Sequence, residues 1–156
     1  MKLHLGCGRK RWEGWTNCDI RGSEHDCDIR ELPFADESAD DIAAIHVLEH
    51  FYIHEVPGVL AEWRRVLRVG GKLTLELPCW DKVQRLIAAG APDNLTRWPL
   101  YGDPATHTDG ATAMHKWCWS RNELCKALSR AGFIEITEET PNFHIPIRDM
   151  RFVAMK

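Results

Sequence analysis

Two glycines and an acidic side chain near the start of the sequence have types and spacing that suit ligand binding. Residues 2–5 (KLHL) run directly into Gly6-Cys7-Gly8, and ten residues separate Gly8 from Asp19. Glycines let backbone amides approach a ligand closely, and a carboxylate accepts hydrogen bonds from both hydroxyls of a ribose. The order and spacing of these residues therefore predict a nucleoside-binding site.

Two histidines and a glutamate form a second group that could do chemistry. Residues 46–50 (HVLEH) match the HxxEH pattern of inverted zinc proteases, in which one helix carries both histidines and a glutamate base. Here the pattern directly follows an expected buried strand, and patterns of five residues often match by chance. The six cysteines form no CxxC pair for a structural zinc site. We keep a zinc hydrolase as a weaker alternative and predict no metal ligands.

Alternating strands and helices are expected to position these groups. Apolar runs predict strands at residues 2–5, 15–20, 41–45, 72–77, 133–137 and 151–155. Helical spacing predicts helices at residues 55–68, 81–89 and 120–131. We expect Gly70-Gly71 to stop the first of these helices, and Ser120 with Glu123 to form a capping box that starts the last.

The alternation predicts an α/β fold in one domain spanning residues 1–156. We expect a single doubly wound, mostly parallel sheet flanked by helices, with ligands bound beyond the carboxyl ends of the strands. Only a short helix or a turn fits between the first two strands, so the first helix should be shortened. The glycines, Asp19 and His46 all fall at expected strand ends.

The segment 78–119 is longer than an ordinary connection and rich in Pro, Gly, Asp, His and Trp. We expect it to be a lid insertion on the substrate side of the site. Its aromatic side chains either line a pocket or anchor the lid, and we favour the anchoring role. They are Trp80, Trp98, Tyr101, Trp117 and Trp119.

Composition narrows the class of protein. The 156 residues are 44% apolar, which suits one globular domain, and the formal net charge of −3 offers no broad cationic surface for nucleic acid. A membrane-spanning helix needs roughly 18 to 20 consecutive apolar residues, and the sequence contains no such run. We therefore expect a cytoplasmic protein with reduced cysteines and a small-molecule partner, and no nucleic-acid or membrane partner. The sequence leaves the oligomeric state open.

Five segments together resemble the class I S-adenosylmethionine-dependent methyltransferases, in particular the type-11-like predicted methyltransferases. They are LHLGCG at 3–8, TNCDI at 16–20, DIRELPFADESADDI at 28–42, IHVLEHF at 45–51 and EWRRVLRVGGKLTLELP at 62–78. The resemblance departs from the family where the glycine motif stops after GCG, and where Val69 replaces a frequent proline. Neither departure removes an expected cofactor contact.

The resemblance implies S-adenosylmethionine as cofactor and S-adenosylhomocysteine as its product. It places the glycine turn beside the methionine part of the cofactor, Asp19 on the ribose hydroxyls, and residues 46–48 under the sulfonium. Ile20 and the pair 28–29 should meet the adenine. The residues expected to bind the cofactor are Leu5, Gly6, Cys7, Gly8, Asp19, Ile20, Asp28, Ile29, His46, Val47, Leu48 and His50.

Methyl transfer to an unidentified acceptor, a small polar metabolite or a sugar hydroxyl, is the expected activity. If the acceptor is a hydroxyl, His46 or His115 could remove its proton near neutral pH. The alternative is a regulatory or partner protein that binds S-adenosylmethionine without turnover, because the strong motifs all concern the cofactor.

Two other enzyme classes fit the sequence less well. An NAD-binding oxidoreductase would need a third glycine and a later acidic residue, and the sequence lacks both. Pro78-Cys79 is similar to the nucleophile motif of cytosine-C5 methyltransferases, but it follows a different strand, so we expect a buried or rim cysteine instead.

Overall fold

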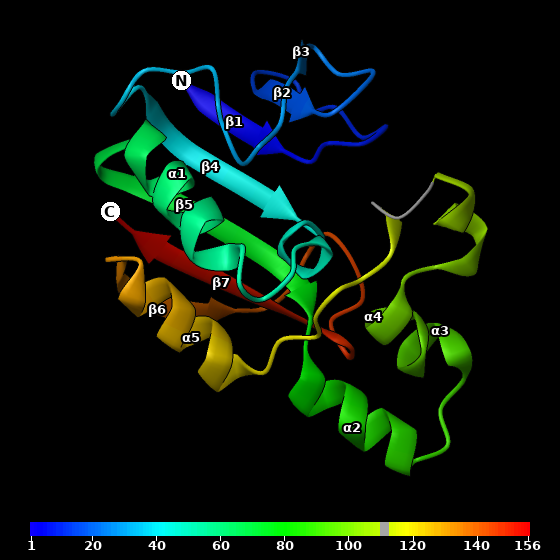
Figure 1. The fold of residues 1–156 in the computed structure, drawn as a ribbon. Coiled ribbons are helices and arrows are strands. Elements are labelled where there is room, and N and C mark those ends of the chain that lie inside the picture. The colour runs from blue at the N-terminus through cyan, green and yellow to red at the C-terminus, as the bar shows by residue number, and fades with distance from the viewer. Residues whose placement is uncertain (110–112) are drawn as a thin grey trace.

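The computed structural model describes residues 1–109 and 113–156, which include all but residues 110–112 of the expected lid. Within them, seven strands form one sheet in the order β3-β2-β1-β4-β5-β7-β6 (Figure 1). The strands are β1 (Lys2–Leu5), β2 (Thr16–Asp19), β3 (His25–Asp26), β4 (Ala39–Ile45), β5 (Leu67–Pro78), β6 (Ile134–Glu139) and β7 (Asp149–Met155). The helices are η1 (Leu48–His50), α1 (Val56–Val66), α2 (Trp80–Ala88), α3 (Asp93–Thr96), α4 (Trp98–Tyr101), η2 (Pro104–Asp109) and α5 (Arg121–Arg130).

The sheet is mostly parallel, as predicted. Strands β1 to β5 pair in parallel, whereas β7 runs antiparallel to both β5 and β6. Parallel strands bring their carboxyl ends to one edge of the sheet. The residues that follow β1, β2 and β4 therefore meet at that edge. Among the described residues, no helix is both long and apolar enough to cross a membrane.

Helices α1 and α5 lie next to each other on one face of the sheet (Figure 1). Helix α1 buries Val59, Leu60 and Trp63 at helical spacing, which explains why this stretch is helical. Helix α5 begins with the predicted capping box, because Ser120 Oγ accepts from the Glu123 amide and the Glu123 side chain accepts from the Ser120 amide.

The end of α1 differs from the prediction. The helix stops at Val66, because Leu67 has an extended backbone with ψ 135° and begins β5. Gly70 and Gly71 therefore lie inside the strand rather than after the helix. Gly71 is needed there, since a Cβ at this position would lie 2.8 Å from the carbonyl oxygen of Arg68.

Loops cover the opposite face of the sheet where it meets the first connection. His4 of β1 stacks on Trp12 at 4.0 Å between ring centroids, and Trp12 stacks on Phe143 at 4.7 Å. Residues 6–15, between β1 and β2, contain turns and no helix. Of the two possibilities that the sequence allowed for this connection, the structure has the turn.

The segment 78–119 leaves and rejoins the sheet at one place. Cys79 forms a parallel β-bridge with Trp119, and the Trp80 amide donates to the Trp119 carbonyl at 2.8 Å. Between these points α2, α3 and α4 extend beyond the end of β5 (Figure 1). Trp119 is 1% exposed and anchors the return. The predicted helix at 81–89 is confirmed as α2.

Candidate functional site

The glycine turn after β1 requires glycine for two reasons. Gly6 has a φ of 63° and Gly8 a φ of 53°, in the left-handed region that favours glycine. A Cβ on Gly6 would also lie 2.5 Å from Cγ2 of Val47. At Gly8 the same space is empty within 4 Å, so a ligand can approach its backbone.

Asp19 ties the end of β2 to this turn. Its two carboxylate oxygens accept from the amides of Gly8 and Ile20, each at 2.7 Å. Each carboxylate oxygen can accept a second hydrogen bond, so the side chain can still receive ribose hydroxyls. Ile20, next to it, is an apolar side chain that is 52% exposed. A bare glycine backbone, a carboxylate with spare acceptor capacity and an exposed apolar surface fit a nucleoside cofactor.

Five of the predicted cofactor residues belong to the apolar core. Their side chains are all at most 7% exposed and pack inward; they are Leu5, Cys7, Ile29, Val47 and Leu48. The Ile29 carbonyl accepts from the indole of Trp63 at 2.8 Å. If these residues contact a ligand, the contact must be made by their backbone atoms.

Asp28 lies on the surface in an ion pair. Arg30 donates to both of its carboxylate oxygens, with Nη2 at 2.7 Å from Oδ2. The hydrogen bonds from this guanidinium hold the pKa of Asp28 below its ordinary value. Arg30 also binds Glu55 at 3.0 Å, which fixes the loop before β4 to the start of α1.

His46 follows β4 and lies between two buried carboxylates. Its Nδ1 is 3.0 Å from Glu49 Oε1, and its Nε2 is 3.3 Å from Asp149 Oδ2. Burial alone would lower its pKa, but the two carboxylates outweigh burial and raise the pKa of His46 to about 9. Its φ of 55° is uncommon for a residue with a side chain.

Asp149, at the start of β7, is fully buried and fully partnered. Arg148 donates to both of its oxygens, at 2.8 and 3.1 Å, and the Ile145 amide donates at 3.1 Å. Burial would raise the pKa of Asp149, but His46 and Arg148 hold it far below its ordinary value.

The backbone of residues 46–50 does not have the geometry that the zinc-hydrolase interpretation requires. That interpretation requires one helix that places both histidines on the same face. In the structure His46 precedes a single turn of 3-10 helix, η1, and has a left-handed backbone.

His115 reaches the same cluster from the long segment. Its Nδ1 lies 2.8 Å from the Pro99 carbonyl and its Nε2 lies 4.0 Å from Glu49 Oε1. The amides of Lys116 and Trp117 donate to the Glu49 carbonyl at 2.7 and 3.2 Å, which docks this stretch on η1. Burial lowers the pKa of His115, so its ring is neutral at neutral pH.

Comparison with known families decides the class. Residues 8–75 match the family described as a methyltransferase domain. Residues 8–75 therefore contain a methyltransferase domain, and the whole chain has the fold of solved S-adenosylmethionine-dependent methyltransferases. The predicted resemblance and fold are thus confirmed, and the proteins that share this fold use S-adenosylmethionine.

Solved methyltransferases share the whole fold at low identity. An S-adenosylmethionine-dependent methyltransferase from Archaeoglobus fulgidus is 18% identical, covers 99% of this chain and 85% of its own, and has a TM-score of 0.72. The 1,6-didemethyltoxoflavin-N1-methyltransferase of Burkholderia thailandensis, solved with 1,6-didemethyltoxoflavin and S-adenosylhomocysteine, is 16% identical over 99% of this chain and 70% of its own, with a TM-score of 0.66.

One curated relative is closer in sequence but much longer. An uncharacterized 37.1 kDa protein in transposon TN4556 of Streptomyces fradiae is 43% identical over 56 residues. The match spans 36% of this chain and 16% of that protein.

Cys79 has the properties of a core residue. It is 0% exposed, and burial raises the pKa of its thiol above the ordinary value. A protonated, inaccessible thiol is a poor nucleophile. The expectation of a buried cysteine is therefore confirmed.

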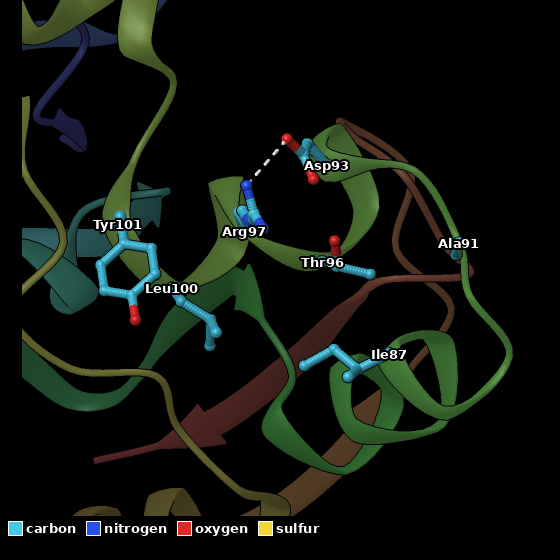
Figure 2. Close-up of a pocket in the computed structure, with 7 residues that line it drawn as sticks. All are labelled: Ile87, Ala91, Asp93, Thr96, Arg97, Leu100 and Tyr101. Atoms are coloured by element: carbon cyan, nitrogen blue, oxygen red, sulfur yellow. Dashed lines mark hydrogen bonds and ion pairs between the residues drawn. The ribbon is translucent and has the colours of Figure 1, made fainter.

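A pocket of about 390 Å³ lies within the long segment, and its described lining includes none of the residues predicted to bind cofactor. Figure 2 shows the residues that line it. Asp93 and Arg97 form an ion pair at 3.4 Å on its wall. The pocket is lined by Ile87, Ala91, Asp93, Thr96, Arg97, Leu100 and Tyr101.

The structure brings together site residues that sequence reasoning left apart. His46 and His115 both lie near Glu49, which the resemblance marks only as a neighbour of the cofactor. Asp149 was not predicted at all, because 103 residues separate it from His46. Its position at the start of the last strand carries no sequence signal for a site.

Proposed function

We propose that the protein transfers the methyl group of S-adenosylmethionine to an oxygen or nitrogen of a small acceptor, either a polar metabolite or a sugar hydroxyl. The observation that carries this proposal is the glycine turn hydrogen-bonded to Asp19, beside the His46 cluster at the neighbouring strand end. When bound, the cofactor supplies an activated methyl group on a sulfonium.

The cofactor is held, in this proposal, by backbone groups of the glycine turn and by the carboxylate of Asp19. Ile20 offers an apolar surface for the adenine. The other residues proposed to contact the cofactor are Leu5, Cys7, Asp28, Ile29, His46, Val47, Leu48 and His50.

The acceptor enters, we propose, under residues 78–119. His115 belongs to this segment, and its Nδ1 faces a carbonyl, which can only accept. Its Nε2 therefore carries a lone pair that can take a proton from a hydroxyl. His46 has a carboxylate at each ring nitrogen, so its role is to position the neighbouring groups. Precise alignment of reactants can supply about 7 to 11 kcal/mol, so a strong base is not required.

Calorimetric titration with S-adenosylmethionine, S-adenosylhomocysteine and NAD tests the cofactor part. We expect both sulfur ligands to bind the wild type and to bind Asp19→Asn about 10-fold or more weakly, because hydrogen bonds to a charged group are lost. Asp36→Asn, which changes a surface aspartate beside Arg65, is the control and should bind normally. Binding of NAD alone, or equal affinity in the two variants, would contradict the proposal.

Release of S-adenosylhomocysteine in the presence of candidate acceptors tests turnover. Screening hydroxyl and amine acceptors should find one that accelerates this release, and His115→Ala should slow it at least 100-fold if Nε2 takes the proton. Full turnover by His115→Ala would dismiss that role. A protein that binds cofactor but releases no product with any acceptor would favour the alternative of a regulatory protein.

A further inference from the structure

Glu49 is a buried carboxylate that is paired with His46 but has unused hydrogen-bond acceptor capacity. It is 0% exposed, and neither of its oxygens makes a hydrogen bond with the described residues. His46 Nδ1 lies 3.0 Å from Oε1 as an ion-pair contact, but without the geometry of a hydrogen bond. Because buried polar atoms normally have hydrogen-bond or metal partners, the two oxygens of Glu49 have acceptor capacity that a bound cation could use in addition to the contact with His46.

Two histidines face this carboxylate, and each is oriented by a backbone carbonyl. Nδ1 of His50 lies 3.2 Å from the Met114 carbonyl, and Nδ1 of His115 lies 2.8 Å from the Pro99 carbonyl. A carbonyl only accepts, so each Nδ1 carries the proton and each Nε2 keeps a lone pair. In histidines that bind metals, one ring nitrogen contacts the metal, and the N–H of the other nitrogen usually donates to a group such as a carbonyl.

We propose that Glu49, His50 and His115 bind one divalent transition-metal ion of the zinc class. One ligand atom from each residue lies within 4.8 Å of the other two. Zinc bonds of about 2.0–2.2 Å place tetrahedral ligands roughly 3.3–3.6 Å apart, so the cluster must contract by roughly 1 Å. Two imidazoles and a carboxylate are a ligand set that leaves a position open for a further ligand. This proposal replaces the expectation of no metal.

A second cluster, His46 with His144 and Asp149, has similar ligand types but no need of an ion. Both oxygens of Asp149 already accept from Arg148, which neutralises the carboxylate. The difference in partners between Asp149 and Glu49 therefore assigns the ion to the cluster around Glu49.

The proposed ion would lie beside the residues assigned to the cofactor. If the proposed methyl transfer is correct, the open position of the ion would bind and orient an oxygen of the acceptor. In the ion-bound protein His115 would be a ligand of the ion and would not take the proton of the acceptor. The ion would then be the group that activates the acceptor.

Zinc titration of chelator-treated protein tests this inference without cofactor or acceptor, so a failure of methyl transfer leaves the test intact. Calorimetry and elemental analysis should give one ion per chain. His50→Ala and His115→Ala should weaken binding at least 100-fold, whereas His54→Ala, an exposed histidine of the same segment, and His144→Ala should bind as the wild type does. No binding by the wild type, or loss in His144→Ala alone, would overturn the proposal.

Cobalt absorption of the wild-type protein gives a second measurement that needs no variant to fold. Co²⁺ bound by two imidazoles and a carboxylate should show visible d–d bands without thiolate charge-transfer bands. A strong thiolate band would assign the ion to cysteines such as Cys118 and would refute the site.

Discussion

The two neighbouring parts of the site are built in different ways. At the ends of β1 and β2, the proposed cofactor region consists of Gly6, Gly8 and Asp19, which lie within the first 19 residues. The acceptor region combines Glu49, which follows β4, with residues from two later segments, His115 and Asp149. The first region uses backbone amides and a local turn, whereas the second depends on tertiary contacts between buried charged side chains.

The difference shows in how each carboxylate is stabilised. Asp19 is half-buried and accepts from two amides of its own neighbourhood. Glu49 and Asp149 are 0% exposed, and beside a local partner each contacts a histidine from a distant segment, His115 for Glu49 and His46 for Asp149. A local change should therefore disrupt the cofactor region, while the acceptor region should be sensitive to changes in the segments that deliver its side chains.

Gly6→Ala should have the largest effect on the cofactor region. The left-handed φ and the contact with Val47 should together cost about 2 to 5 kcal/mol of stability and weaken S-adenosylmethionine binding about 100-fold or more. Chemical denaturation and calorimetric titration measure the two effects.

Gly14→Ala is the matched control, since Gly14 has a φ of 75° with nothing within 4 Å of an added Cβ. It should lose only about 1 to 2 kcal/mol, from the backbone strain, and keep its affinity for cofactor. Equal effects of the two substitutions would show that the turn does not need close approach to Val47.

Glu76→Gln should have the next largest effect, on the acceptor region. The buried carboxylate of Glu76 accepts from the amides of residues 142–144 and from Arg151, and so fixes the turn before Asp149. The loss of charge should cost about 2 to 4 kcal/mol in chemical denaturation.

Glu139→Gln offers the control for this change. Glu139 also binds Arg151, at 3.0 Å, but it is half-exposed, so its loss should cost less than about 1 kcal/mol. If both variants lost the same stability, the ion pairs rather than the turn would account for the role of Glu76.

Cys79→Ala should have the smallest effect. Removing one buried sulfur should cost about 1 to 2 kcal/mol and leave cofactor affinity unchanged. Mass spectrometry after iodoacetamide treatment of the native wild type should find Cys79 unmodified at neutral pH, because burial raises the pKa of its thiol. Rapid modification of Cys79 would show that the region is open and would revive a nucleophilic role.

The sequence predicted the parts of the fold that local patterns determine. The strand leading into Gly6, the capping box at Ser120 and the helix around Trp63 all depend on neighbouring residues, and the structure has each of them. The roles of the individual cofactor residues remain predictions.

Other features were beyond sequence reasoning for physical reasons. Strand β3 has two residues, too few for a periodic signal, and it formed part of an expected loop. The stack of His4, Trp12 and Phe143 joins residues from both ends of the chain, and no local pattern records such a contact. The contact of Glu49 with His115 was hidden for the same reason.

The antiparallel last strand has a consequence for synthesis of the chain. Strand β5, with Leu73, Leu75 and Leu77, lies between β4 and β7, but β7 is synthesised only after the segment 78–119, α5 and β6. At about 5–20 residues per second, one edge of β5 stays open on the nascent chain for roughly 4 to 15 s. Unpaired apolar edges invite association with other chains. Completion of β7 therefore ends the exposure of this edge on the growing polypeptide.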